Sequence, residues 1–133
     1  METITDLETL ISSMEPILDD VEYVFVTCKV RPEFLTPPIL EFRESEGLAL
    51  VVRRSEAERL GLKYEFPSKR ITLMVYSSLS AVGFLAEICK ALAQAGISVN
   101  PVSAFYHDNL FVPVDRAEDA MIILKNLASQ SKK

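Results

Sequence analysis

The sequence predicts an α+β fold in which two units, each ordered strand, helix, strand, strand, helix, stand in tandem, with antiparallel sheets and helices on one face. Residues 71–127 pass between strand and helix periodicity in that order. Residues 42–60 repeat the plan of residues 105–124, and a short stretch with a glycine and a proline separates the halves. We therefore expect a degenerate N-terminal half with a leading helix at residues 1–66 and a C-terminal unit at residues 67–133.

The C-terminal unit begins with a strand, then a polar turn and a helix. The strand is indicated by alternating apolar residues, namely Ile71, Leu73 and Val75. After a turn at residues 77–78, residues 80–95 show the three- and four-residue spacing of an amphipathic helix. The apolar face of this helix consists of Val82, Leu85, Ile88, Cys89 and Leu92. Gly96 follows, where the end of a helix favours a residue that tolerates positive φ.

Two strands and a second helix complete this unit. A strand restarts at residues 97–99, and Pro101 argues for a bulge or an edge before the strand resumes at residues 102–106. A turn and a strand at residues 110–114 follow, and Asp115 with Glu118 suits a capping box at the start of the last helix. The apolar face of that helix holds Ala117, Ala120, Met121, Leu124 and Leu127. The resulting order βαββα is ferredoxin-like.

The N-terminal half contains a similar but incomplete series. Residues 24–28 suit a first strand, but the three prolines within residues 31–38 exclude a full helix, so this half has lost its first helix. Ser55 and Glu58 suit a capping box for the helix that follows its last strand. A leading helix is expected to be capped by Thr5 and Glu8 and to end near Pro16. Its apolar stripe comprises Leu7, Leu10, Ile11, Met14 and Leu18.

Composition excludes several classes of function. The chain has 133 residues, 49% of them hydrophobic, and a net charge of -5 with dispersed basic residues, which disfavours nucleic acid as a partner. No apolar run is long enough to span a membrane and the first residues lack a secretory signal, so we expect a cytoplasmic protein. Cys28 and Cys89 lie in apolar patterns that favour free buried thiols.

Catalytic, metal and cofactor motifs are missing from the sequence. His107 is the only histidine, and His107 with Asp108 is too small a set for a zinc site. The sequence has no glycine-rich phosphate loop and no nucleophile elbow. We therefore expect no enzymatic activity and no cofactor. A histidine in a turn most often bonds its own loop or borders an interface, and contact with a ligand is the second interpretation of His107.

Three stretches carry a resemblance to a known family. They are the turn and helix start at residues 77–85, the group Gly96, Ile97 and Asn100, and the run at residues 105–113. Together they resemble an ACT domain, and more narrowly small tandem-ACT proteins that are distant kin of cytosolic arginine sensors. The chain departs from many ligand-binding members because Ser78 and Val82 stand where those have an acidic residue and a proline.

The resemblance implies a regulatory module that binds a free amino acid or similar metabolite and works as a homodimer. The candidate ligand-binding residues are Ser77, Ser78, Leu79, Ser80, Val82, Gly83, Phe84, Asn100, Val102, Ser103 and His107. Backbone N–H groups at the helix start suit a carboxylate, and Gly83 allows its close approach. Asp108, or a carboxylate of the other half, could supply the charge that an ammonium group needs.

A second interpretation of the same residues requires no metabolite. Gly83 then permits tight packing of helix on sheet, the serines cap the helix or turn, and Asn100 satisfies the end of a strand. The protein would be an interaction or dimerisation module whose pocket is filled by its own side chains.

Overall fold

The computed structural model describes residues 2–131 and contains one antiparallel, six-stranded sheet in the order β2-β3-β1-β4-β6-β5. The strands are β1 (Glu15–Cys28), β2 (Leu40–Glu44), β3 (Gly47–Arg53), β4 (Glu65–Met74), β5 (Asn100–Ser103) and β6 (Asp108–Pro113). The helices are α1 (Leu7–Ser13), α2 (Arg54–Arg59), α3 (Phe84–Gln94) and α4 (Ala117–Ser131), with a 3₁₀ turn η1 (Val114–Arg116) before α4. This is the α+β arrangement of two ferredoxin-like units that the sequence predicts.

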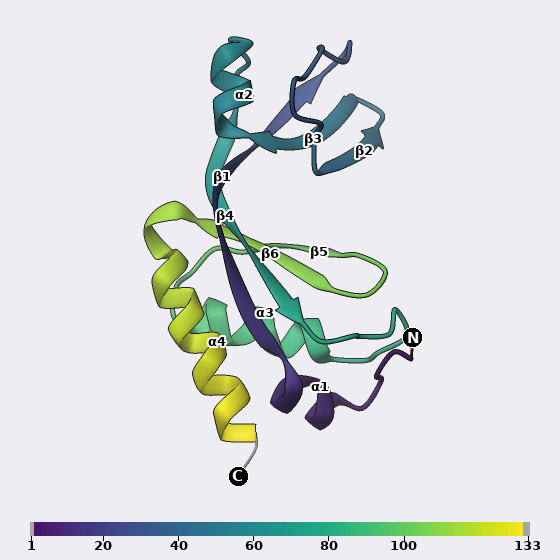
Figure 1. The fold of residues 1–133 in the computed structure, drawn as a ribbon, viewed down its shortest axis with the longest axis vertical. Coiled ribbons are helices and arrows are strands. Elements are labelled where there is room, and N and C mark those ends of the chain that lie inside the picture. Colours follow the sequence, from purple (N-terminus) through teal and green to yellow (C-terminus); the bar gives the residue numbers. More distant parts are fainter. Residues whose placement is uncertain (1, 132–133) are drawn as a thin grey trace.

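The two units share the long strands β1 and β4, which run between the two lobes in Figure 1. Residues 23–28 of β1 pair with β3 in the N-terminal unit. Residues 15–18 of the same strand pair with β4 and form the outer strand of the C-terminal unit, opposite β6 and β5. Each unit therefore contains part of a strand that begins in the other. The predicted division between residues 66 and 67 falls inside β4 and stays a prediction.

The C-terminal unit has the larger core, because α1, α3 and α4 all cover its part of the sheet. Its fully buried side chains include Leu10, Ile71, Leu73, Ile88, Leu92, Leu110 and Leu124. The core of the N-terminal unit is smaller and lies under α2, with Val24, Leu50, Val52 and Ala57 at its centre. A third cluster on the other side of the sheet joins the units through Tyr23, Val51 and Phe111.

The leading helix is shorter than predicted. It ends at Ser13, and Pro16 and Leu18 belong to β1. The N-cap is Asp6, whose side chain accepts a hydrogen bond from the N–H of Thr9, so the predicted cap at residues 5 and 8 is wrong. Strand pairing with β4 overrides the helical spacing here, because it buries Pro16 and partly buries Leu18.

Other element boundaries also differ from the predictions. Helix α3 begins at Phe84 rather than at residue 80, because Gly83 has φ 89° and interrupts the helical backbone. Strand β5 begins at Asn100 rather than at residue 97. The capping boxes predicted at Ser55 and Asp115 are not formed, because α2 begins one residue before Ser55 and a 3₁₀ turn leads into α4.

The loss of the first helix from the N-terminal half is confirmed, because residues 29–39 form neither a helix nor a strand. Glu56 of α2 holds this loop through hydrogen bonds from the backbone N–H groups of Leu35 and Thr36. The side chain of Arg59 also donates to Glu56, and this bond, with those from the loop, lowers the pKa of Glu56 to about 2. A buried carboxylate therefore fixes the segment that replaces the helix.

Candidate ligand site at the start of helix α3

A small cavity lies between the loop after β4 and the turn that joins β5 to β6. It has a volume of about 80 Å³. Its walls are formed by Ser77, Ser78, Leu79, Ala81, Phe84, Leu85, Ser103, Ala104 and Asp108. Residues far apart in the sequence therefore meet at the first turn of α3.

Asp108 is the charged group of this cavity and is only 7% exposed. Its two oxygens accept hydrogen bonds from the hydroxyl of Ser103 at 2.7 Å and from that of Ser77 at 3.3 Å. No lysine or arginine among the described residues forms an ion pair with it. Burial of a carboxylate is costly unless a charge or several hydrogen bonds compensate it. The two hydroxyls compensate only part of that cost, so the carboxylate favours a cation.

The loop over the cavity is held by its backbone. Ser77 donates its N–H to the carbonyl oxygen of Tyr106 at 3.0 Å. Ile4 of the N-terminal segment donates to the carbonyl of Tyr76 at 2.6 Å and accepts from the N–H of Ser78 at 2.9 Å. The resulting parallel bridge between Ile4 and Ser77 fastens the N-terminal segment to the cavity loop.

Gly83 sets the direction of α3 and does not line the cavity. Its φ of 89° lies in the left-handed region that favours glycine. A Cβ atom built at this position would meet only the side chain of Leu7, at 3.7 Å. The glycine is therefore required by its backbone angle rather than by crowding.

The structure brings five of the predicted ligand-binding residues to the cavity. They are Ser77, Ser78, Leu79, Phe84 and Ser103.

Six others lie outside the cavity wall, namely Ser80, Val82, Gly83, Asn100, Val102 and His107. Val82 is 84% exposed, and Val102 packs on the other side of the sheet with Phe111. The role of all predicted residues in binding stays a prediction.

Sequence reasoning did not place Ala81, Leu85 and Ala104 at the site, although all three line it. No spacing rule distinguishes these small or apolar residues from core residues. Leu85 belongs to the apolar face of the predicted helix, and a helix that faces a sheet has its first turn beside any cavity there. The position of Leu85 on the apolar face of the predicted helix, near its start, is therefore the signal that could have identified it as a cavity residue.

His107 has a structural role in the turn. Its Nδ1 atom lies 3.0 Å from the carbonyl oxygen of Val75, and its ring lies 5.2 Å from that of Tyr76. These contacts join the β5–β6 turn to the segment after β4. The described residues contain no group of three or more histidine, cysteine or acidic side chains that could hold a metal ion.

Both cysteines are free and half-buried. Cys89 lies one helical turn after Leu85, near the cavity. Burial, and then the negative charge of Asp108, raise the pKa of the Cys89 thiol. A raised pKa lowers the fraction of reactive thiolate at neutral pH. Cys89 is therefore a weak nucleophile in this environment.

Exposed apolar side chains lie on the two loops that contribute to the cavity wall. Leu79 is 67% exposed and Phe105 is 66% exposed. Tyr106 makes edge contacts with Phe105 and Tyr76 at ring separations of 4.8 and 5.7 Å. Exposed apolar groups that gather beside a polar cavity are typical of ligand or protein contact sites.

The comparisons with known proteins agree with this geometry. Two family models described as ACT domain match residues 2–69 and residues 65–126, in tandem. The chain belongs to the ACT domain family. ACT domains are typically regulatory and ligand-binding, and they are generally not catalytic. None of the curated proteins that were compared matches the chain.

Several solved structures have a similar fold. A Vibrio cholerae protein of unknown function, described as a possible transport protein, is 38% identical, with a TM-score of 0.81 over 92% of this chain and 95% of that one. An Agrobacterium tumefaciens protein is 16% identical, with a TM-score of 0.73 over 86% and 89%. The regulatory subunit of aspartate kinase from Thermus thermophilus is 11% identical, with a TM-score of 0.59 over 88% and 98%. The last two likenesses concern the fold alone.

None of the helices described in residues 2–131 has both the length and the apolar character needed to cross a bilayer.

Proposed function

We propose that this ACT-domain protein is a cytoplasmic sensor that binds a free amino acid, or a close relative with an ammonium group, at the cavity beside α3. Asp108 carries the proposal. It is buried, it accepts hydrogen bonds from Ser77 and Ser103, and no basic side chain among residues 2–131 pairs with it. An ammonium group would supply the missing positive charge and three hydrogen-bond donors.

The start of α3 supplies donors for the other end of such a ligand. The first N–H groups of a helix have no partner within the helix, and the N-terminal end favours negative charge. Phe84 and Leu85, the first residues of α3, line the same cavity as Asp108. A zwitterion with its ammonium at Asp108 and its carboxylate at this turn matches both ends of the site.

The cavity must enlarge to admit an amino acid. Its volume of about 80 Å³ is well below the roughly 300 Å³ at which small-molecule pockets begin. The loop of residues 77–81 has no regular secondary structure and is the part that must move. Ligand binding would then shift the loop from a closed to an open arrangement and so change the surface around Leu79.

A thermal-shift screen of the full chain against the proteinogenic amino acids tests this proposal. A dye or circular dichroism serves as readout because the chain has no tryptophan. We expect one amino acid to give a saturable rise in Tm. Asp108→Asn should abolish the rise, and Asp115→Asn, at an exposed carboxylate, should retain it. A flat panel at millimolar concentrations would refute the sensor proposal.

The backbone geometry decides which variant can be used to block the site. Gly83→Phe is unsuitable because a side chain at φ 89° strains the backbone whether or not a ligand binds. Ala81→Leu is preferable, since Ala81 lines the cavity in an irregular segment.

The exposed apolar side chains on the loops beside the cavity favour a second candidate, a dimerisation module without a metabolite. In such a dimer, Leu79, Val82 and Phe105 pack against a second copy. The side chains that line the small cavity then leave no room for a ligand. Two results together would favour this candidate over the sensor. The protein would form a homodimer whose dissociation constant rises with Phe105→Ser, and no amino acid would raise its Tm.

A further inference from the structure

Within residues 2–131, the wall of the cavity beside α3 contains a single charged side chain, that of Asp108. Of the other wall residues, three are serines and five are apolar. The apolar ones are Leu79, Ala81, Phe84, Leu85 and Ala104. An ammonium group bound to Asp108 would use this charge, so the wall would hold no second charge to pair with the side chain of a ligand.

The serine hydroxyls of the wall already form hydrogen bonds. Ser77 and Ser103 donate to Asp108, and a hydroxyl has only one proton to donate. The hydroxyl oxygen of Ser78 accepts a hydrogen bond from the N–H of Ser80 at 3.0 Å. A polar or charged ligand side chain would therefore lose its contacts with water and gain few partners from the wall, which is costly.

The apolar residues of the wall come from both sides of the cavity. Phe84 is 2% exposed and belongs to the core of the C-terminal unit, and Ala81 and Leu85 pack against that core. Leu79 and Ala104 lie on the two loops and are exposed. A ligand side chain that enters between the loops and α3 would cover apolar surface on both sides, and the removal of apolar surface from water is favourable.

We propose that this cavity selects amino acids whose side chain is apolar and uncharged. The proposal rests on the proposed sensor function, because it takes the ammonium group at Asp108 and the carboxylate at the first turn of α3 as given. The side chain of the ligand then contacts Leu79, Ala81 and Ala104. Amino acids with a cationic side chain, such as lysine and arginine, are excluded because the wall has no second carboxylate.

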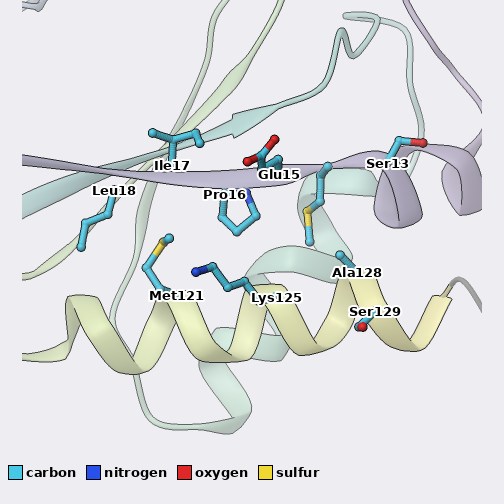
Figure 2. A pocket seen from close by; sticks show the side chains of 10 residues that line it. Ser13, Glu15, Pro16, Ile17, Leu18, Met121, Lys125, Ala128 and Ser129 are labelled. Atoms are coloured by element: carbon cyan, nitrogen blue, oxygen red, sulfur yellow. The ribbon is translucent and has the colours of Figure 1, made fainter.

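A charged amino acid would find partners at a different place on the protein. The groove between β1 and α4, of about 620 Å³, is lined by both an acidic and a basic side chain, Glu15 on the strand and Lys125 on the helix (Figure 2). Neither residue lines the cavity beside α3. Binding of a charged amino acid must therefore be assigned to one of the two places, which Asp108→Asn and Glu15→Gln distinguish.

Three pairs of amino acids with side chains of equal size test the proposal. The pairs are valine with threonine, leucine with asparagine, and norleucine with ornithine. Each is titrated into the full chain by isothermal calorimetry. In every pair that binds, we expect the apolar member to bind more tightly by about tenfold or more, because the polar member buries a group without a partner.

A second carboxylate in the wall should change the selection. Ala104→Asp adds that carboxylate, and we expect it to reverse the order of affinities of norleucine and ornithine. Ala93→Asp, the same change at an exposed position of α3 outside the wall, should keep the order of the wild type. Both positions are exposed, so the variants are expected to fold, which a thermal melt checks.

The possible failures separate this proposal from the sensor function. If the polar member of a pair binds as tightly as the apolar one, and Asp108→Asn abolishes both, the sensor stands and the apolar selection is overturned. An order of affinities that Ala104→Asp leaves unchanged also overturns the selection alone. If none of the proteinogenic amino acids binds, both proposals fail. Both also fail if only ornithine binds, with an affinity that Glu15→Gln lowers and Asp108→Asn does not.

Discussion

The hydroxyl of Ser68 donates a hydrogen bond to the carbonyl oxygen of Tyr23 at 3.1 Å, at a site where Ser68 is fully buried. The same two residues face each other in the β1–β4 register. Tyr23 also pairs with Arg53 of β3, and Ser68 with Pro113 of β6. Strands β1 and β4, the first strands of the two units, thus meet at equivalent positions. The hydrogen bond between Ser68 and Tyr23 lies at the junction of the two units.

Removal of this hydroxyl should weaken the whole chain. Ser68→Ala is expected to lower the free energy of unfolding by about 1 kcal/mol, the usual contribution of one buried hydrogen bond. Urea unfolding followed by circular dichroism measures it, with Ser129→Ala, at an exposed position, as the control. Because the strands are shared, one cooperative transition is expected. Two separate transitions would contradict the shared-strand account.

Glu56 should make stability depend on pH in the acid range. Its pKa is lowered from 4.5 to about 2 in the folded protein, mainly by the hydrogen bond from Arg59. A depressed pKa stabilises the fold above the unfolded value near 4.5, and that contribution is lost as the pH falls towards 2.

The matched pair Glu56→Gln and Glu58→Gln tests this dependence by urea unfolding at pH 7, 5 and 3. The wild type should exceed Glu56→Gln in stability at neutral pH, and the difference should shrink as the pH falls. Glu58→Gln, at a more exposed carboxylate, keeps Glu56 and should therefore retain the pH dependence of the wild type. A difference between wild type and Glu56→Gln that is constant with pH would assign the role of Glu56 to packing alone.

The N-terminal segment should keep the cavity loop closed. Ile4→Pro removes the N–H that bonds Tyr76, and we expect hydrogen exchange of the loop at residues 77–81 to accelerate by about fivefold, the effect of one lost bond. Thr3→Pro, next to it at an exposed position, is the control. Equal exchange in both variants would mean that the segment does not restrain the loop.

Much of the fold follows from local patterns. The alternation at Ile71 and Leu73 and the stripe through Ile88 and Leu92 predict β4 and α3, and all four side chains are buried. The prolines in residues 31–38 exclude a helix because proline lacks an N–H, and that segment has none.

The remainder depends on tertiary contacts. Leu18 fits a helical stripe in the sequence, but pairing with Ile71 places it in β1. The length of a shared strand is decided by its partners, which periodicity does not reveal. The site shows the same limit. Ser77 and Ser103 are identified as candidates by type and place, but their meeting at Asp108 depends on the packing of two distant loops.

The central claim is that Asp108 holds the ammonium group of a ligand. The most direct measurement is isothermal titration of the amino acid that stabilises the protein, and of its analogue without the amino group, into wild type and Asp108→Asn. The account predicts binding in only one of the four combinations, the amino acid with the wild type. Equal affinity of the wild type for the analogue, or unchanged affinity of Asp108→Asn for the amino acid, would contradict it.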